Sequence, residues 1–142
     1  MRTRLLVHVD DDEAMAFLVK RALRNGGLMG WEIKHLSNGD SALDYLTRAT
    51  LGEVAWPDLL VLDIRMPGFD GLDVLEWASS NVPEIPAVML SSSELLRDRL
   101  RARDLGSKGY FVKSPQFAEL LEFLRRWDET ALAASTPAHA TQ

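Results

Sequence analysis

Short apolar runs alternate along the chain with stretches in which apolar residues recur at helical spacing. The runs predict five strands, each followed by a predicted helix. The predicted strands are Leu5 to Val9, Trp31 to Leu36, Leu59 to Leu62, Ala87 to Leu90 and Gly109 to Val112. The predicted helices are Ala14 to Leu23, Ser41 to Arg48, Leu72 to Ser79, Glu94 to Leu105 and Phe117 to Trp127. Strict alternation predicts an α/β fold, with a parallel sheet covered by helices on both faces.

Acidic residues follow two of the predicted strands. Asp10, Asp11 and Asp12 come after the first, and Asp63 directly follows the third. If these strands are parallel neighbours, Asp10, Asp11 and Asp63 surround one point at the carboxyl edge of the sheet, where such folds bind ligands. Like charges roughly 4 Å apart repel by about 4 kcal/mol at an effective dielectric near 20, so the cluster needs a cation. Oxygen ligands without nearby Cys or His favour Mg²⁺.

A simpler interpretation treats these acids separately. Asp10 to Glu13 could serve as turn and helix-capping acids, and Asp63 alone is more often a solvated loop residue. The joint pattern at two strand ends favours a site.

The size and composition of the chain limit the number of domains and the classes of function to consider. At 142 residues the chain has room for one ordinary domain. Lys and Arg total 16 against 21 acidic residues, a net charge of -5, which argues against DNA binding. The chain lacks Cys, and the apolar stretch near its N-terminus is too short for a signal peptide or membrane span, so we expect a cytoplasmic protein. We expect a domain over residues 1–128 and, over 129–142, the last helix end and a disordered tail.

Four segments, in order, resemble the receiver domain of two-component response regulators over about residues 4 to 128. They are Val9-Asp10-Asp11-Asp12, Leu62-Asp63-Ile64-Arg65-Met66-Pro67-Gly68-Phe69-Asp70-Gly71, Met89-Leu90-Ser91-Ser92-Ser93 and Gly109-Tyr110-Phe111-Val112-Lys113. The resemblance implies a flavodoxin-like, doubly wound (βα)5 fold with strand order 2-1-3-4-5. The loop from Gly27 to Gly30 and the segment Asn38 to Leu46 resemble the single-domain regulators that partner phytochrome-type sensor kinases.

The resemblance implies a role for each site residue. Asp63 would accept a phosphoryl group from a sensor histidine kinase. Asp10, Asp11, Asp63 and the backbone carbonyl of Arg65 would bind Mg²⁺. Lys113 would contact a phosphoryl oxygen, and Ser91 would donate its hydroxyl to the phosphoryl group.

The resemblance also implies how the signal leaves the domain. Tyr110 would turn toward the space that Ser91 vacates and change the surface formed by the fourth helix, fifth strand and fifth helix. That surface would bind a downstream protein or form a homodimer. The chain would act as a stand-alone regulator and not as an enzyme, beyond self-phosphorylation and slow self-dephosphorylation.

The chain departs from the family pattern at two positions. Ser114 follows Lys113, where the family usually has Pro, and a cis peptide before a residue other than Pro costs about 2.5 to 4 kcal/mol. Arg65 is a bulky cation two residues beyond Asp63. We hypothesise that Arg65 shields the acyl phosphate from water; an unchanged phosphoryl lifetime in Arg65→Ala would reject this.

Two other groups of residues invite interpretation. The predicted helix from Glu94 carries Arg97, Arg99, Arg101 and Arg103 beside Asp98 and Asp104. Such a run is more often a solvated face than a partner surface. His8, within the first strand, is expected to be a satisfied strand residue and not a catalyst.

Three alternative functions remain. A receiver-like interaction module that no longer accepts phosphate need not keep Asp10, Asp11, Asp63, Ser91 and Lys113 together. A phosphatase of the haloacid dehalogenase type would want an acid where the chain has Arg65. A flavin-binding module would want a Gly- and hydroxyl-rich loop after the first strand, where four successive acids would repel phosphate.

Overall fold

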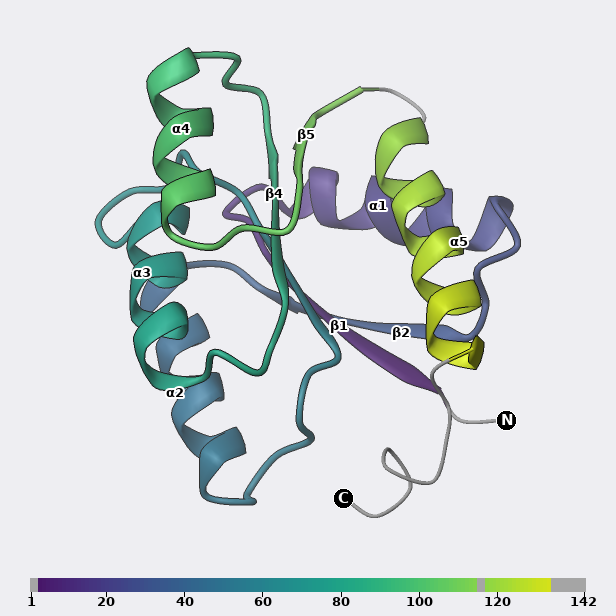
Figure 1. Cartoon of the computed structure of the whole chain (residues 1–142), viewed down its shortest axis with the longest axis horizontal. Coiled ribbons are helices and arrows are strands. Elements are labelled where there is room, and N and C mark those ends of the chain that lie inside the picture. Colours follow the sequence, from purple (N-terminus) through teal and green to yellow (C-terminus); the bar gives the residue numbers. More distant parts are fainter. Residues whose placement is uncertain (1–2, 115–116, 134–142) are drawn as a thin grey trace.

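The computed structural model describes residues 3–114 and 117–133, with side chains described as far as Trp127. Helices and strands alternate along this part of the chain (Figure 1). The strands are β1 (Arg4–Val9), β2 (Trp31–Leu36), β3 (Leu59–Leu62), β4 (Ala87–Ser91) and β5 (Tyr110–Val112). The helices are α1 (Glu13–Asn25), α2 (Gly39–Thr50), α3 (Gly71–Asn81), α4 (Leu96–Asp104) and α5 (Ala118–Ala133). The predicted disordered tail after α5 lies outside the described residues.

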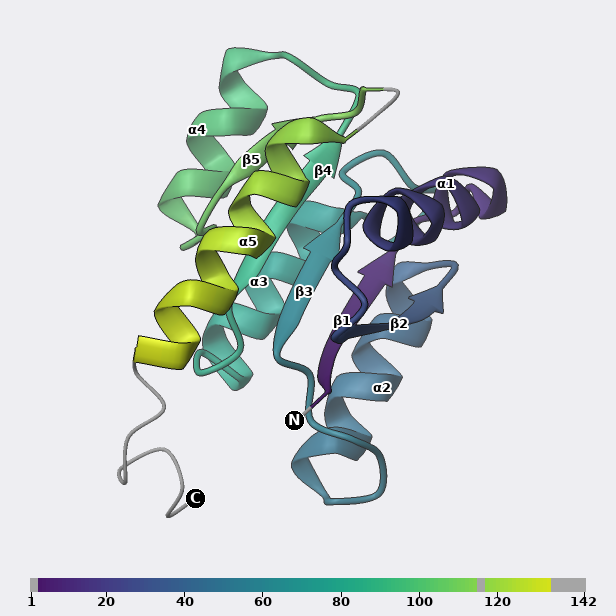
Figure 2. The ribbon, with the colours of Figure 1, turned by 90° about the vertical axis from the view of Figure 1, so that its right-hand side faces the viewer.

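The five strands form one parallel sheet in the order β2-β1-β3-β4-β5. This order confirms the predicted doubly wound fold, in which the chain starts near the middle and winds toward each edge. The arrows of β1, β3 and β4 point toward the same edge of the sheet (Figure 2). The residues that follow these strands are therefore brought together at that edge.

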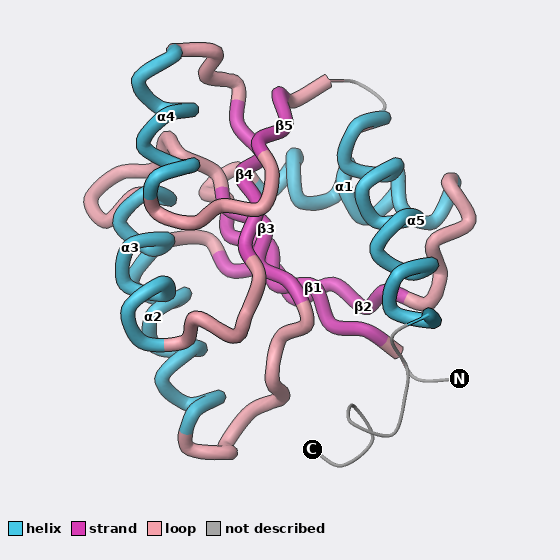
Figure 3. The backbone as a smooth tube through the Cα atoms, viewed as in Figure 1, coloured by secondary structure: helices cyan, strands magenta, loops and turns pink. Residues whose placement is uncertain are grey.

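Helices cover both faces of the sheet. The helices α1 and α5 lie on one face, and α2, α3 and α4 lie on the other (Figure 3). A buried apolar cluster fills each interface, with Leu6, Val61 and Leu124 in one and Val7, Leu62 and Leu75 in the other. The strand β3 is wholly buried, as its unbroken apolar run predicts. Among the described residues, no helix is long and apolar enough to cross a membrane.

The helices α2, α3 and α4 begin at residues other than those predicted, and side chains cap two of them. The helix α2 begins before Ser41 because the Asn38 side chain accepts a hydrogen bond from the Ser41 amide. Asp70 and Asp73 form a reciprocal capping box, so α3 also begins earlier than its apolar spacing indicates. The helix α4 begins later than predicted, at Leu96, with no side-chain cap.

The start of α5 also differs from the prediction. Phe117 lies just before the helix, with φ at 51°, although it is buried like the predicted apolar face. The segment from Lys113 onward begins with a trans peptide, because no described peptide bond is cis. The structure therefore accommodates Ser114 without the unfavourable cis bond.

The loop between β3 and α3 is fixed by close backbone packing. Ile64 is fully buried and Met66 is nearly so. A Cβ atom at Gly71 would lie 2.0 Å from the Asp63 carbonyl oxygen and 2.7 Å from its carbonyl carbon. Only Gly allows the start of α3 to approach the Asp63 backbone so closely, so this contact helps to fix the position of Asp63.

We predict that Gly71→Ala destabilises the protein by about 1 to 3 kcal/mol or more, because backbone must move to relieve the overlap. Urea denaturation followed by circular dichroism measures the change. Gly30→Ala is a suitable control, since a Cβ there meets nothing within 4 Å. Equal stability of the two variants would contradict this account of the loop.

Candidate functional site

Three carboxylates meet at the carboxyl edge of the sheet, as the sequence predicts. Asp10, Asp11 and Asp63 each offer an oxygen, and these oxygens lie within 4.8 Å of one another. Asp10 is fully buried and Asp63 is only 3% exposed, whereas Asp11 is exposed. The interpretation of Asp63 as a solvated loop residue is therefore wrong.

Backbone hydrogen bonds hold the two buried acids in place. The Asp10 amide donates to the Leu36 carbonyl at 3.0 Å, and the Asp63 amide donates to the Val9 carbonyl at 2.9 Å. Each bond extends a ladder between neighbouring strands by one residue. The acids are thus positioned as rigidly as the strands themselves.

Lys113 provides the cation nearest to the acids among the described residues. Its Nζ lies 2.9 Å from Asp10 Oδ2 and 3.4 Å from Asp63 Oδ1. The Lys113 amide donates to the Ser91 carbonyl at 2.9 Å, which fixes the backbone beyond β5 to the end of β4. The ammonium group partly neutralises the two acids.

Ser91 and Tyr110 are linked through one residue of the loop after β4. Ser91 is buried at the end of that strand, and its Oγ accepts a hydrogen bond from the Ser93 amide at 3.2 Å. The half-buried Tyr110 donates its hydroxyl to the Ser93 carbonyl at 2.8 Å. Ser91 therefore lies at the end of β4, and Tyr110 contacts the loop that follows this strand.

A family model for the response regulator receiver domain matches residues 6–125 of the chain. The chain belongs to the response regulator receiver family. The probable transcriptional regulatory protein TcrX of Mycobacterium tuberculosis is 32% identical over 117 residues, which cover 82% of this chain and 46% of TcrX. The chain spans about half the length of the first curated relatives that it matches.

Solved receiver structures share the fold. The phosphorylated cyanobacterial phytochrome response regulator RcpA is 28% identical, with a TM-score of 0.76, and the match covers 94% of this chain and 97% of RcpA. The regulator TrrA of Thermotoga maritima, solved in complex with Mg²⁺ and BeF, is 28% identical with a TM-score of 0.72, covering 87% and 98% of the two chains. These similarities confirm the predicted resemblance.

The acids of the receiver differ strongly in protonation. Burial and the neighbouring Asp10 charge together raise the pKa of Asp63 to about 6, although the Lys113 ammonium and the Arg65 amide act in the opposite direction. Burial alone would also raise the pKa of Asp10, but the His8 ring, the Asp12 amide and the Lys113 ammonium lower it to about 2. Burial opposes the charge on Lys113, yet Asp10 and Asp63 raise its pKa. Between these two buried acids, Asp63 is thus the one whose negative charge is less favoured.

The donor set of Asp10, Asp11 and Asp63 fits Mg²⁺. Hard carboxylate oxygens are the ligands this ion prefers, and the exposed Asp11 leaves one side open for water or a phosphoryl group. The backbone carbonyl of Arg65, two residues beyond Asp63 in the chain, completes the predicted ligand set. Asp10, Asp11, Asp63 and that carbonyl remain the predicted ligands.

Two histidines lie behind Asp10, contrary to the expectation of no nearby His. His35 Nε2 is 2.7 Å from the Asp10 carbonyl oxygen, and the rings of His8 and His35 have centroids 5.9 Å apart. His8 is fully buried, its Nε2 is 3.6 Å from Asp10 Oδ2, and neither ring nitrogen has a hydrogen-bond partner. The prediction that His8 is satisfied is therefore wrong. Burial lowers its pKa despite the nearby Asp10, so we treat it as neutral.

The side chain of Arg65 points toward α4. Its Nη2 lies 2.6 Å from Oδ2 of Asp98. Asp98 belongs to a charge run that is expected to be solvated, but its side chain is only 8% exposed. The spacing of four residues between Asp98 and the buried Ala102 is the one sequence signal that could have placed Asp98 on the inner face.

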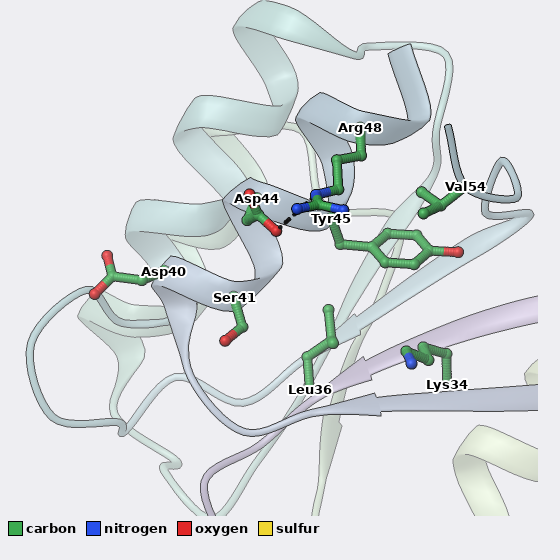
Figure 4. Close-up of a pocket in the computed structure, with 8 residues that line it drawn as sticks. All are labelled: Lys34, Leu36, Asp40, Ser41, Asp44, Tyr45, Arg48 and Val54. Carbon is green, nitrogen blue, oxygen red and sulfur yellow. Dashed lines mark ion pairs between the residues drawn. The ribbon is translucent and has the colours of Figure 1, made fainter. Parts of the chain in front are cut away.

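A hollow in the receiver lies away from these acids. Its volume is about 510 Å³, and its lining comes from β2, α2 and the loop after α2 (Figure 4). Lys34, Tyr45 and Arg48 are among the lining residues, and none of the acids at the strand ends belongs to it. The receiver site is instead an open cluster of charged groups at the sheet edge.

We predict that Asp63→Asn stabilises the metal-free protein at pH 7.5. The pKa of Asp63 is about 6 in the folded state against an ordinary value of 3.8, so the folded state binds more protons between pH 4 and pH 6. Stability therefore falls as pH rises through that window, and ionised Asp63 costs about 1 to 3 kcal/mol above it.

Urea denaturation in EDTA at pH 7.5 and pH 4 measures this effect. The gain from Asp63→Asn should be present at the higher pH and absent at the lower, where wild-type Asp63 is protonated. Asp104→Asn is an exposed control on α4. An Asp63→Asn variant that is less stable than wild type at pH 7.5 would refute the proposed charge strain.

Proposed function

We propose that this receiver accepts a phosphoryl group on Asp63 from the phosphohistidine of a sensor kinase, in a Mg²⁺-dependent reaction. The observation that carries the proposal is the meeting of a buried Asp63 with Asp10, Asp11 and the Lys113 ammonium. Positioning and charge stabilisation are the main requirements of phosphoryl transfer, and this arrangement offers both.

The proposed reaction forms one bond and breaks another. An oxygen of the Asp63 carboxylate attacks phosphorus as the bond from phosphorus to the kinase imidazole nitrogen breaks. The imidazole keeps the electron pair of that bond and takes a proton from solvent, so the products are an acyl phosphate and a neutral histidine. Lys113 binds a phosphoryl oxygen, and the Ser91 hydroxyl donates to another. Bound Mg²⁺ supplies positive charge for the phosphoryl oxygens and relieves the repulsion among the acids.

The proposed output is a changed protein contact and not a catalysed reaction on another substrate. The helix α4 exposes Leu96 and Leu100, with Leu95 just before it, and Tyr110 on β5 reaches the loop that precedes this helix. These residues support an output surface over α4, β5 and α5 that contacts a downstream protein or a second copy of the chain. The net charge of -5 disfavours DNA as the direct partner.

The similarity to RcpA supports a phytochrome-type sensor kinase as the phosphoryl donor. Stand-alone action and a cytoplasmic location stay predictions. Immunoblotting of fractionated native cells would check both, with a single band of the size of the 142-residue chain expected in the cytoplasmic fraction.

Intact mass spectrometry tests the central proposal. Incubation with a small phosphodonor and Mg²⁺ should add one phosphoryl group to wild type, less without Mg²⁺, and none to Asp63→Asn. Asp104→Asn is the matched control and should be modified like wild type. No adduct on wild type would favour a receiver-like module that does not accept phosphate, and an adduct on Asp63→Asn would exclude Asp63 as the acceptor.

Light scattering tests the proposed homodimer. Beryllofluoride with Mg²⁺, which mimics the acyl phosphate, should increase the scattering mass toward that of two chains. Leu96→Asp and Leu100→Asp, each on exposed parts of α4, should prevent this increase because they place charge in an apolar contact. An unchanged mass for wild type would remove the homodimer from the proposal.

A further inference from the structure

The helix α4 is weakly anchored by apolar packing. Of its nine residues only Asp98 and Ala102 are buried, and no side chain caps its first turn. It lies beside α3 on one face of the sheet (Figure 1). One of the two side chains that α4 buries against the rest of the protein is therefore the carboxylate of Asp98.

Asp98 joins three segments of the chain. Its Oδ2 accepts a hydrogen bond from Arg65 Nη2 at 2.6 Å, in the loop after β3. The same oxygen accepts a hydrogen bond from Ser93 Oγ at 2.6 Å, in the loop after β4. Short bonds between charged groups are among the stronger polar contacts, and the Asp98 side chain is shielded from water.

Ser93 connects this ion pair to the phosphoryl-sensing residues. Its amide donates to Ser91 Oγ, and its carbonyl accepts from the Tyr110 hydroxyl. Arg99, next to Asp98 on α4, places its guanidinium carbon 4.6 Å from the centre of the Tyr110 ring. A continuous set of contacts thus runs from the loop after Asp63 to Ser91 and Tyr110.

We propose that Arg65, Asp98 and Ser93 form a latch that holds α4 and the loop after β4 in the unphosphorylated arrangement. The proposal rests on the proposed function of Asp63. For Ser91 to reach a phosphoryl group, the loop that contains Ser93 must move, and Asp98 opposes that movement by holding the Ser93 side chain. Asp98 is thus a positioning residue that sets how often the unmodified receiver visits the activated arrangement.

If this latch exists, the loop after β4 should open more often when either charge of the ion pair between Arg65 and Asp98 is removed. Asp98→Asn and Arg65→Gln should each speed amide hydrogen exchange of residues 92–98 in the unmodified protein by about tenfold, the effect of losing about 1.4 kcal/mol. The double variant should gain no more than the larger single effect, because both substitutions break one ion pair.

Two controls separate the latch from general loosening of α4. Glu76→Gln removes another ion pair between α3 and α4, in which Arg101 Nη2 lies 3.5 Å from Glu76 Oε2, without touching Ser93. Asp104→Asn removes an acid that pairs with the adjacent Arg103. Neither should change exchange in residues 92–98. Unchanged exchange in Asp98→Asn, or equal increases in Glu76→Gln, would overturn the latch.

The initial rate of phosphorylation by a subsaturating small phosphodonor provides the second readout. Asp98→Asn should be phosphorylated severalfold faster than wild type, whereas Glu76→Gln and Asp104→Asn should match wild type. Faster exchange without faster phosphorylation would refute the coupling to Asp63. If wild type accepts no phosphoryl group, the proposed function fails, while the exchange measurements still decide whether the ion pair holds the loop.

Discussion

Repulsion between buried carboxylates is the constraint on which the arrangement of the sheet edge depends. Asp10 and Asp63 are both nearly inaccessible to water, and each is held by a backbone bond that continues a strand ladder. Lys113 reaches both acids, but Asp63 keeps a pKa of about 6. The protein therefore retains an unfavourable negative charge where a bound cation would relieve it, which is a common compromise between stability and function.

The fold and most of this edge could be predicted because they follow from local pattern and strand order. The buried run Leu59 to Leu62 and the acid that follows it are read directly from the sequence. The first residue of α3 was harder to predict from the sequence, since it depends on the capping box of Asp70 and Asp73 as well as on apolar spacing. His8 was misjudged because a strand pattern does not reveal whether a buried ring finds a hydrogen-bond partner.

Asp98 shows a different limit of sequence reasoning. Its neighbours on α4 are mostly charged and exposed, so charge patterning favours a solvated helix. Its partners Arg65 and Ser93 lie 33 and 5 residues away in the chain, and only the tertiary fold brings Arg65 to it. The same contacts give α4 a polar attachment to the rest of the protein beside the apolar contact of the buried Ala102.

The edge strand β2 has a consequence for solubility. A six-residue strand at the edge of a sheet offers unpaired backbone groups to strands of other molecules. In β2 the exposed Glu32 and Lys34 alternate with the half-buried Ile33 and His35. A foreign strand that paired there would have to accommodate charges of both signs on one face. The charged face of β2 thus protects the protein against aggregation through this edge.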